Sequence, residues 1–150
     1  MALRIIRTDD DPILRKTAKE ITEINDRIKE LADDMLETMY DAEGVGLAGP
    51  QIGVLRRICV IDVGEGPVVM INPRITKQEG ENIDFEGCLS FPEKAGKVAR
   101  PEKCEVEFTD LEGDLCTAVG EGLMARAICH ELDHLDGVCF VDKVIEDEEA

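Results

Sequence analysis

Aromatic side chains are scarce in this sequence: they make up 3% of the residues, and tryptophan is absent. Aliphatic side chains must therefore fill the core. No apolar run approaches the roughly 20 residues that a membrane-spanning helix requires, and the opening stretch MALRIIRTDDDP becomes acidic too early for a secretory signal peptide. We therefore expect residues 1–150 to form a single cytoplasmic domain, because a chain of this length can bury roughly 70% of its unfolded surface.

Basic side chains are also few in comparison with acidic ones. The chain has 17 Lys and Arg against 34 Asp and Glu, which gives a formal net charge of −17. Such a charge opposes binding to phosphate backbones and to anionic lipid. We expect neither nucleic-acid binding through a basic patch nor membrane association, and we expect the acidic tail, residues 146–150, to be frayed and solvated.

The cysteines do not have the spacing of a disulfide or zinc framework, because no CxxC pair occurs among them. Nothing directs the chain to an oxidising compartment, so most of them are predicted to be reduced and buried. The six are Cys59, Cys88, Cys104, Cys116, Cys129 and Cys139. Cys88 differs from the others because it lies in the loop-like stretch EGCLS between β segments.

Hydrophobic periodicity predicts two long helices. Apolar residues step by three and four from Ile24 to Met39, which predicts an amphipathic helix over residues 25–42. Gly44 is expected to end it in the left-handed conformation that favours glycine. A second helix is predicted over residues 121–135, with Gly137 as its stop.

The middle of the chain is predicted to be β structure. Stretches rich in β-branched residues or with alternating polarity indicate strands at residues 57–63, 68–71, 104–109 and 115–119. A brief helix is expected from Asp11, where Pro12 suits a first turn. Helix, strands and helix joined by short connections predict an α+β domain, with helices packed on antiparallel sheet.

The only two histidines of the chain, His130 and His134, both fall in the pentapeptide HELDH. Residues four apart lie on one helical face, about 6 Å from each other, so both imidazoles can reach one cation. Glu131 lies beside the first histidine and can take a proton from a water molecule at that cation. The pattern therefore predicts a metal site.

Two imidazoles leave a catalytic metal short of one protein ligand. Because the chain has no third histidine, the ligand must be a carboxylate or a thiolate. Cys129 directly precedes His130 and is rotated by about 100° from it on the helix, so it should face away from the metal. Cys88 is a suitable soft ligand for iron or zinc. The spacing leaves Cys88 and an unidentified Asp or Glu both open.

The glycine-rich stretch GVGLAGPQIG, residues 44–53, does not fit a nucleotide-binding loop. Neither a Lys-Ser/Thr pair after the glycines nor a strand before them is present. It is either a tight connection from helix to sheet or a place where an extended ligand adds as a strand. In the second case Gln51 would supply a side-chain amide to a developing oxyanion.

The stretches GVGLAGPQIG, EGCLS and HELDH, in this order and at these separations, resemble the three signature motifs of the peptide deformylases. The resemblance continues through DMLETMYDAEGVGLAGPQIG and EGLMARAICHELDHLDGVCFVDKV. It implies one catalytic α+β domain, with antiparallel sheets around a central metal-binding helix and a long N-terminal helix on the outside. The implied activity is removal of the formyl group from N-formylmethionyl peptides and nascent chains, with release of formate and transient ribosome association.

The resemblance also implies roles for individual residues. Cys88, His130 and His134 would bind one divalent ion, Fe²⁺ in the cell, with Zn²⁺, Ni²⁺ or Co²⁺ able to replace it. Glu131 would be the catalytic acid/base, and Gln51 and the backbone N–H of Leu89 would hold the formyl oxygen. The substrate would be bound by Val45, Gly46, Glu86 and Ala127.

Two positions depart from the family pattern. Gly49 stands where a second alanine is usual, and we expect it to loosen the loop that carries Gln51. Cys129 stands where a glutamine usually precedes the first histidine, which removes an amide that could brace the site. Two other functions stay open: a zincin-type metallopeptidase, which needs a downstream His or Glu as third ligand, and a non-catalytic metal-binding relative with a closed site.

Overall fold

The computed structural model describes residues 2–145. The acidic tail, residues 146–150, lies outside the described residues, so its expected fraying stays a prediction. The elements in chain order are η1 (Pro12–Arg15), α1 (Asp26–Asp41), β1 (Gly46–Ala48), η2 (Gly49–Ile52), β2 (Ile58–Ile61), β3 (Val68–Glu79), β4 (Asn82–Cys88), β5 (Phe91–Arg100), β6 (Lys103–Thr109), β7 (Leu115–Glu121), α2 (Leu123–Leu135) and η3 (Phe140–Asp142). Among the described residues, none of the helices is both long and apolar enough to cross a membrane.

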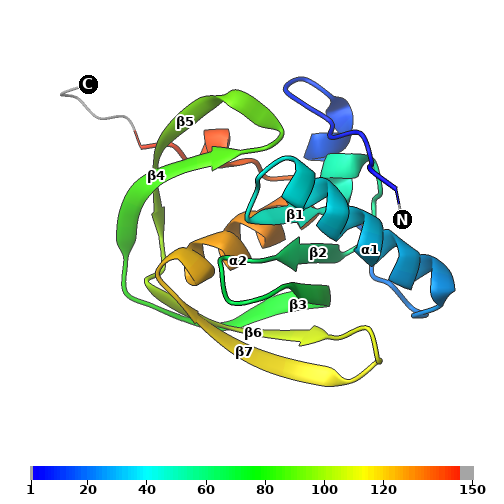
Figure 1. Cartoon of the computed structure of the whole chain (residues 1–150). Coiled ribbons are helices and arrows are strands. Elements are labelled where there is room, and N and C mark those ends of the chain that lie inside the picture. Colours follow the sequence, from blue (N-terminus) through cyan, green and yellow to red (C-terminus); the bar gives the residue numbers. More distant parts are fainter. Residues whose placement is uncertain (1, 146–150) are drawn as a thin grey trace.

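The strands form two antiparallel sheets, which confirms the predicted α+β class. One has five strands in the order β1-β2-β3-β6-β7, and the other is the hairpin β4–β5. Helix α2 lies between this hairpin and the five-stranded sheet, whereas α1 lies on the outside against β1 and β2 (Figure 1). The predicted central position of the helix that carries both histidines is therefore confirmed.

Helix α1 forms where the periodicity predicts it, and Asn25 caps it by accepting a hydrogen bond from the backbone N–H of Ile28. The prediction for Gly44 is wrong. The left-handed residue after the helix is Glu43, with a φ of 59°. Gly44 instead leaves room for a neighbouring side chain, because a Cβ on it would lie 2.7 Å from Cδ1 of Leu89. The predicted stop of α2 is confirmed, since Gly137 is left-handed with a φ of 76°.

The β structure is more extensive than the sequence predicts. Strand β3 continues to Glu79, and β1, β4 and β5 were not expected at all. Cys88 is therefore the last residue of a strand and does not lie in a loop. The pairing of β4 with β5 shifts register between Gly87 and Cys88, and such irregularities redirect the side chains that follow them.

The first residues form an extended strap across α1 and the hairpin turn. The backbone N–H of Ala2 donates to Asp34, and Arg4 adds a second bond and an ion pair to the same carboxylate. Further along, the N–H of Arg7 donates to the carbonyl of Gln51 over 2.7 Å. The strap thus couples the outer helix to η2.

Asp34 is buried, at 2% exposure, and it carries this attachment. We expect Asp34→Ala to lower the free energy of unfolding by about 1–3 kcal/mol, because the amide of Ala2 loses its acceptor. Urea denaturation followed by circular dichroism measures the change. Asp33→Ala, at the exposed neighbouring position, is the matched control, and equal effects of the two substitutions would contradict the assignment.

Candidate metal centre and active site

Three potential metal ligands come together from two elements. Sγ of Cys88, at the end of β4, lies 3.2 Å from Nε2 of His134 on α2. Nε2 of His134 lies 3.1 Å from Nε2 of His130, one turn earlier. All the ligand atoms of this group lie within 4.8 Å of one another, so of the two ligand types that the sequence left open, the structure favours the thiolate.

The chemistry of this donor set fits a divalent cation. Burial lowers the pKa of His134 well below its ordinary value, with the neighbouring His130 adding to the shift, so its imidazole is neutral and offers a lone pair. Two imidazole nitrogens and one sulfur would hold a divalent cation with the three protein ligands that are typical of catalytic zinc sites. The three residues form the metal-binding site of the protein.

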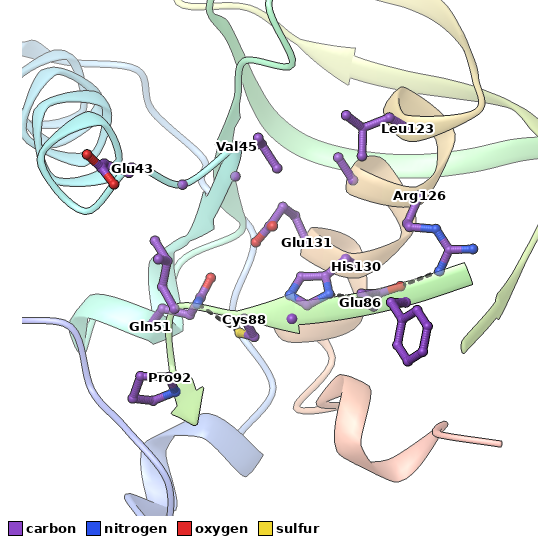
Figure 2. A pocket seen from close by; sticks show the side chains of 16 residues that line it. Glu43, Val45, Gln51, Glu86, Cys88, Pro92, Leu123, Arg126, His130 and Glu131 are labelled. Atoms are coloured by element: carbon purple, nitrogen blue, oxygen red, sulfur yellow. Dashed lines mark hydrogen bonds and ion pairs between the residues drawn. The ribbon is translucent and has the colours of Figure 1, made fainter. Parts of the chain in front are cut away.

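The carboxylate of Glu86 holds His130 from behind. It lies 2.5 Å from Nδ1 of His130 and accepts a hydrogen bond from Arg126 (Figure 2). It also accepts hydrogen bonds from Arg100. Burial alone would raise the pKa of Glu86, but the bonds from His130 and Arg100 outweigh it and bring the pKa to about 2. Because an ionised carboxylate can only accept, Nδ1 of His130 donates to Glu86, so His130 would bind a metal through Nε2.

We expected Glu86 among the substrate-binding residues. The residue lines the cavity, but both of its oxygens are occupied by His130 and the two arginines. Arg100 continues the network to Asp133 over 2.7 Å. The carboxylate of Glu86 is therefore directed at the imidazole and at the two guanidinium groups.

Glu131 is buried beside the ligands and faces the cavity (Figure 2). Its Oε1 atom has no hydrogen-bond partner among the residues that the structure describes. Burial raises the pKa of its carboxyl to about 7, which suits a group that must both accept and donate a proton near neutrality. Gly46 makes room for it, because a Cβ at that position would collide with the Glu131 carboxylate.

Gln51, on η2, is held with its amide toward Cys88. Its Oε1 accepts the backbone N–H of Ala48 over 2.9 Å, and its Nε2 donates to Oγ of Ser90 and to Sγ of Cys88 over 3.1 and 3.4 Å. These bonds fix the amide nitrogen as a donor at the ligand cluster. Leu89 follows Cys88 directly, so its backbone is at the same place.

A cavity of about 440 Å³ opens onto these groups. It includes all the residues expected at the site except His134, whose side chain is fully buried. Its lining also contains residues to which the sequence assigned no role at the site: Glu43, Gly44, Phe85, Gly87, Pro92, Leu123 and Arg126. Phe85 and Leu123 are exposed apolar side chains at this opening. No sequence signal marked Phe85, because strand β4 itself was not predicted.

The structure shows how Gly49 and Cys129, the two departures from the family pattern, are packed. We expected Gly49 to loosen the loop that carries Gln51. Instead it is closely packed, since a Cβ there would lie 2.7 Å from the carbonyl oxygens of Val54 and Arg56. Its missing side chain instead allows close packing. Cys129 belongs to a buried hydrophobic cluster and is not part of the group of potential ligands, which confirms that it points away from the metal ligands.

A three-ligand metal centre with a buried carboxylate beside it, at the base of an open cavity, defines a hydrolytic metalloprotein. A family model described as polypeptide deformylase matches residues 3–150. The chain is 59% identical to the peptide deformylase of Acetivibrio thermocellus over 97% of its own length and 85% of that protein's. It is 58% identical to that of Caldanaerobacter subterraneus over 97% and 91%.

The solved structures agree with the sequence relatives. The crystal structure of peptide deformylase from Thermotoga maritima superposes with a TM-score of 0.94 at 41% identity, covering 96% of this chain and 99% of that one. A peptide deformylase from Synechococcus elongatus, solved in complex with actinonin, gives 0.93 at 41% identity and covers 97% and 80%. The chain belongs to the polypeptide deformylase family.

The bond between Glu86 and His130 can be tested through metal retention. We expect Glu86→Gln to weaken zinc binding by about 10- to 100-fold, because a neutral amide polarises and orients the imidazole less than a carboxylate does. Competition with a chromophoric chelator measures the affinity. Glu93→Gln, on the exposed side of β5, is the control, and an unchanged affinity in Glu86→Gln would show that the bond has no such role.

Proposed function

We propose that this chain removes the N-terminal formyl group from formylmethionine of nascent polypeptides and releases formate, with residues 1–150 acting as one catalytic domain in the cytoplasm. The observation that carries the proposal is the convergence of Cys88, His130 and His134 beside Glu131 in an open cavity. Membership of the polypeptide deformylase family supports it.

Cys88, His130 and His134 would hold one divalent ion, and we propose Fe²⁺ in the cell, with Zn²⁺, Ni²⁺ or Co²⁺ able to take its place. A thiolate with two imidazoles suits any of these ions. When bound, the cation supplies Lewis-acid polarisation and makes water acidic enough to give up a proton near neutral pH.

Glu131 moves the proton. Its ionised carboxylate accepts a proton from the attacking water as the new bond to the formyl carbon forms. It then donates that proton to the departing amine when the carbon–nitrogen bond breaks, so that formate and a free methionine amine are left. The absence of a hydrogen-bond partner for the buried Oε1 atom among the described residues and the pKa of about 7 both support this double use.

Gln51 and Leu89 would stabilise the charge that develops on the formyl oxygen. The Nε2 amide of Gln51 already points to the ligand cluster, and its Oε1 is anchored by Ala48. The backbone N–H of Leu89 is the second proposed donor. One donor of this kind is worth roughly 3–4 kcal/mol in the transition state, because it is fixed before the charge appears.

The substrate would lie against Val45, Gly46 and Ala127, which line the cavity. Phe85 and Leu123 add apolar surface that suits the methionine side chain. Glu86, first expected among the substrate-binding residues, is instead proposed as the residue that orients His130. Transient ribosome association stays part of the proposal, because the substrate is a chain that has just been synthesised.

The two other functions that the sequence left open are less well supported. A zincin-type site takes its third ligand downstream of HELDH, whereas the third candidate here is Cys88, upstream on β4. A purely structural metal site needs neither an open cavity nor a carboxylate oxygen without a hydrogen-bond partner. Here the cavity opens onto the ligands, and Oε1 of Glu131 is such an oxygen.

The central experiment compares hydrolysis of formyl-Met-Ala with that of acetyl-Met-Ala by protein loaded anaerobically with iron. We expect formate release from the first peptide, and Glu131→Gln should lower kcat by about 100- to 10,000-fold because the proton carrier is lost. Metal content should stay unchanged, since Glu131 is not a ligand. Glu112→Gln, on the exposed turn before β7, is the control.

If the iron-loaded wild-type protein and the iron-loaded control both fail to hydrolyse the formyl peptide, the catalytic proposal is refuted and a non-catalytic relative is favoured. Equal rates on the formyl and acetyl peptides would refute the proposed substrate.

Cys88→Ala separates the deformylase from the zincin interpretation. We expect this variant to lose stoichiometric metal and formyl-peptide hydrolysis together, because the remaining imidazoles provide too few donors. Metal analysis after gel filtration gives the answer. Cys116→Ala, at a half-buried thiol on β7, should retain the metal, and full metal content in Cys88→Ala would mean that another residue is the third ligand.

A further inference from the structure

The N-terminal strap contacts both turns that carry the proposed oxyanion donors, Gln51 and Leu89. The backbone N–H of Arg7 donates to the carbonyl oxygen of Gln51 on η2 over 2.7 Å. The N–H of Asp9 donates to the carbonyl oxygen of Ser90 over 2.8 Å. Ser90 follows Leu89 directly in the turn between β4 and β5. The strap therefore holds one donor residue and the immediate neighbour of the other through main-chain bonds.

The two turns are also joined to each other by a side-chain bond. Oγ of Ser90, which is fully buried, accepts a hydrogen bond from Nε2 of Gln51 over 3.1 Å. Nε2 carries two hydrogens, so the second is left for the ligand cluster, where Sγ of Cys88 lies 3.4 Å away. The direction of this second hydrogen depends on where Ser90 is held relative to η2.

The part of the strap that reaches the site, residues 7–9, is fixed on both sides. Before it, the N–H of Arg4 donates to Oγ1 of Thr38 on α1 over 2.9 Å. After it, Asp11 caps η1. Asp9 itself is left-handed, with a φ of 52°, a conformation that aspartate and asparagine adopt more readily than most residues. The amide of Asp9 is therefore aimed at Ser90 by a defined backbone geometry.

We propose that the strap is a positioning element that holds the two oxyanion donors at the separation that one formyl oxygen requires. The main-chain amides of Arg7 and Asp9 carry this role, one for each turn. The inference rests on the proposed deformylation. A developing oxyanion is stabilised best by donors that are in place before the charge appears, and a displacement of about 1 Å can lower the rate by roughly 100-fold.

Asp9→Pro tests the inference at an exposed position. Proline has no N–H and its ring fixes φ near about −65°, so the bond to Ser90 and the left-handed conformation are both lost. We expect kcat on formyl-Met-Ala to fall by about 10- to 100-fold. KM should change by less than about twofold, because the oxyanion contacts are made in the transition state. Metal content should stay unchanged, since the ligands lie on β4 and α2.

Two variants serve as comparisons. Asp9→Asn keeps the N–H and tolerates the left-handed conformation, so it should retain the wild-type kcat and KM. Ala2→Pro removes the bond from Ala2 to Asp34 at the other end of the strap, and it should lower the stability without lowering kcat. Equal losses of kcat in Asp9→Pro and Ala2→Pro, or loss of metal from Asp9→Pro, would show that the strap only stabilises the fold and would overturn the inference.

Nuclear magnetic resonance of the zinc-loaded protein provides a measurement that does not depend on activity. The amides of Arg7 and Asp9 should exchange roughly 100-fold more slowly with solvent than in an unfolded peptide, although both side chains are exposed. The side-chain NH₂ signals of Gln51, assigned through their loss in Gln51→Ala, should shift in Asp9→Pro but not in Asp9→Asn.

The two measurements separate the inference from the proposed function. Slow exchange and shifted Gln51 signals, without formyl-peptide hydrolysis by the iron-loaded wild type, would support positioning by the strap and refute deformylation. Hydrolysis by the wild type, with kcat and the Gln51 signals both unchanged in Asp9→Pro, would overturn the inference and leave deformylation supported.

Discussion

The active site depends on one buried carboxylate, that of Glu86. The hairpin β4–β5 brings Cys88, and α2 brings the two imidazoles, so the metal centre exists only if these two elements are held together in a fixed register. Glu86 belongs to the hairpin, and it is bonded to His130 and Arg126 of α2 as well as to Arg100 of β5. Its negative charge is balanced by two guanidinium groups, which offset the desolvation cost of burying the carboxylate and keep it ionised.

The second requirement is close approach of backbones, and small residues meet it. Gly46 leaves room for the Glu131 carboxylate, Gly44 for the side chain of Leu89, and Gly49 for two carbonyl oxygens. Larger side chains at these places would push the Glu131 carboxylate, the turn after Cys88 or η2 out of position. The glycines of the motif GVGLAGPQIG therefore serve mainly to allow close packing, while Gln51 supplies its one amide donor.

Much of this could be predicted from local sequence, because helix geometry is local. The spacing of His130 and His134 fixes their common face, and the same reasoning correctly turned Cys129 away from it. The third ligand stayed open, since spacing along the chain says nothing about which strand folds over a helix. Strand β4 escaped prediction because its polarity is inverted: Ile83 and Phe85 are exposed whereas Glu86 is buried. The usual rule of apolar residues inside fails where the inside is a polar site.

The N-terminal strap has a consequence for how this part of the chain can change. It reaches the site through main-chain atoms alone, with the amide of Arg7 on the carbonyl of Gln51 and the amide of Asp9 on the carbonyl of Ser90. Any residue except proline can provide such an amide. These two bonds therefore constrain the length and path of the segment more than the side chains at positions 7 and 9, because they tie together the two turns that meet at the cavity.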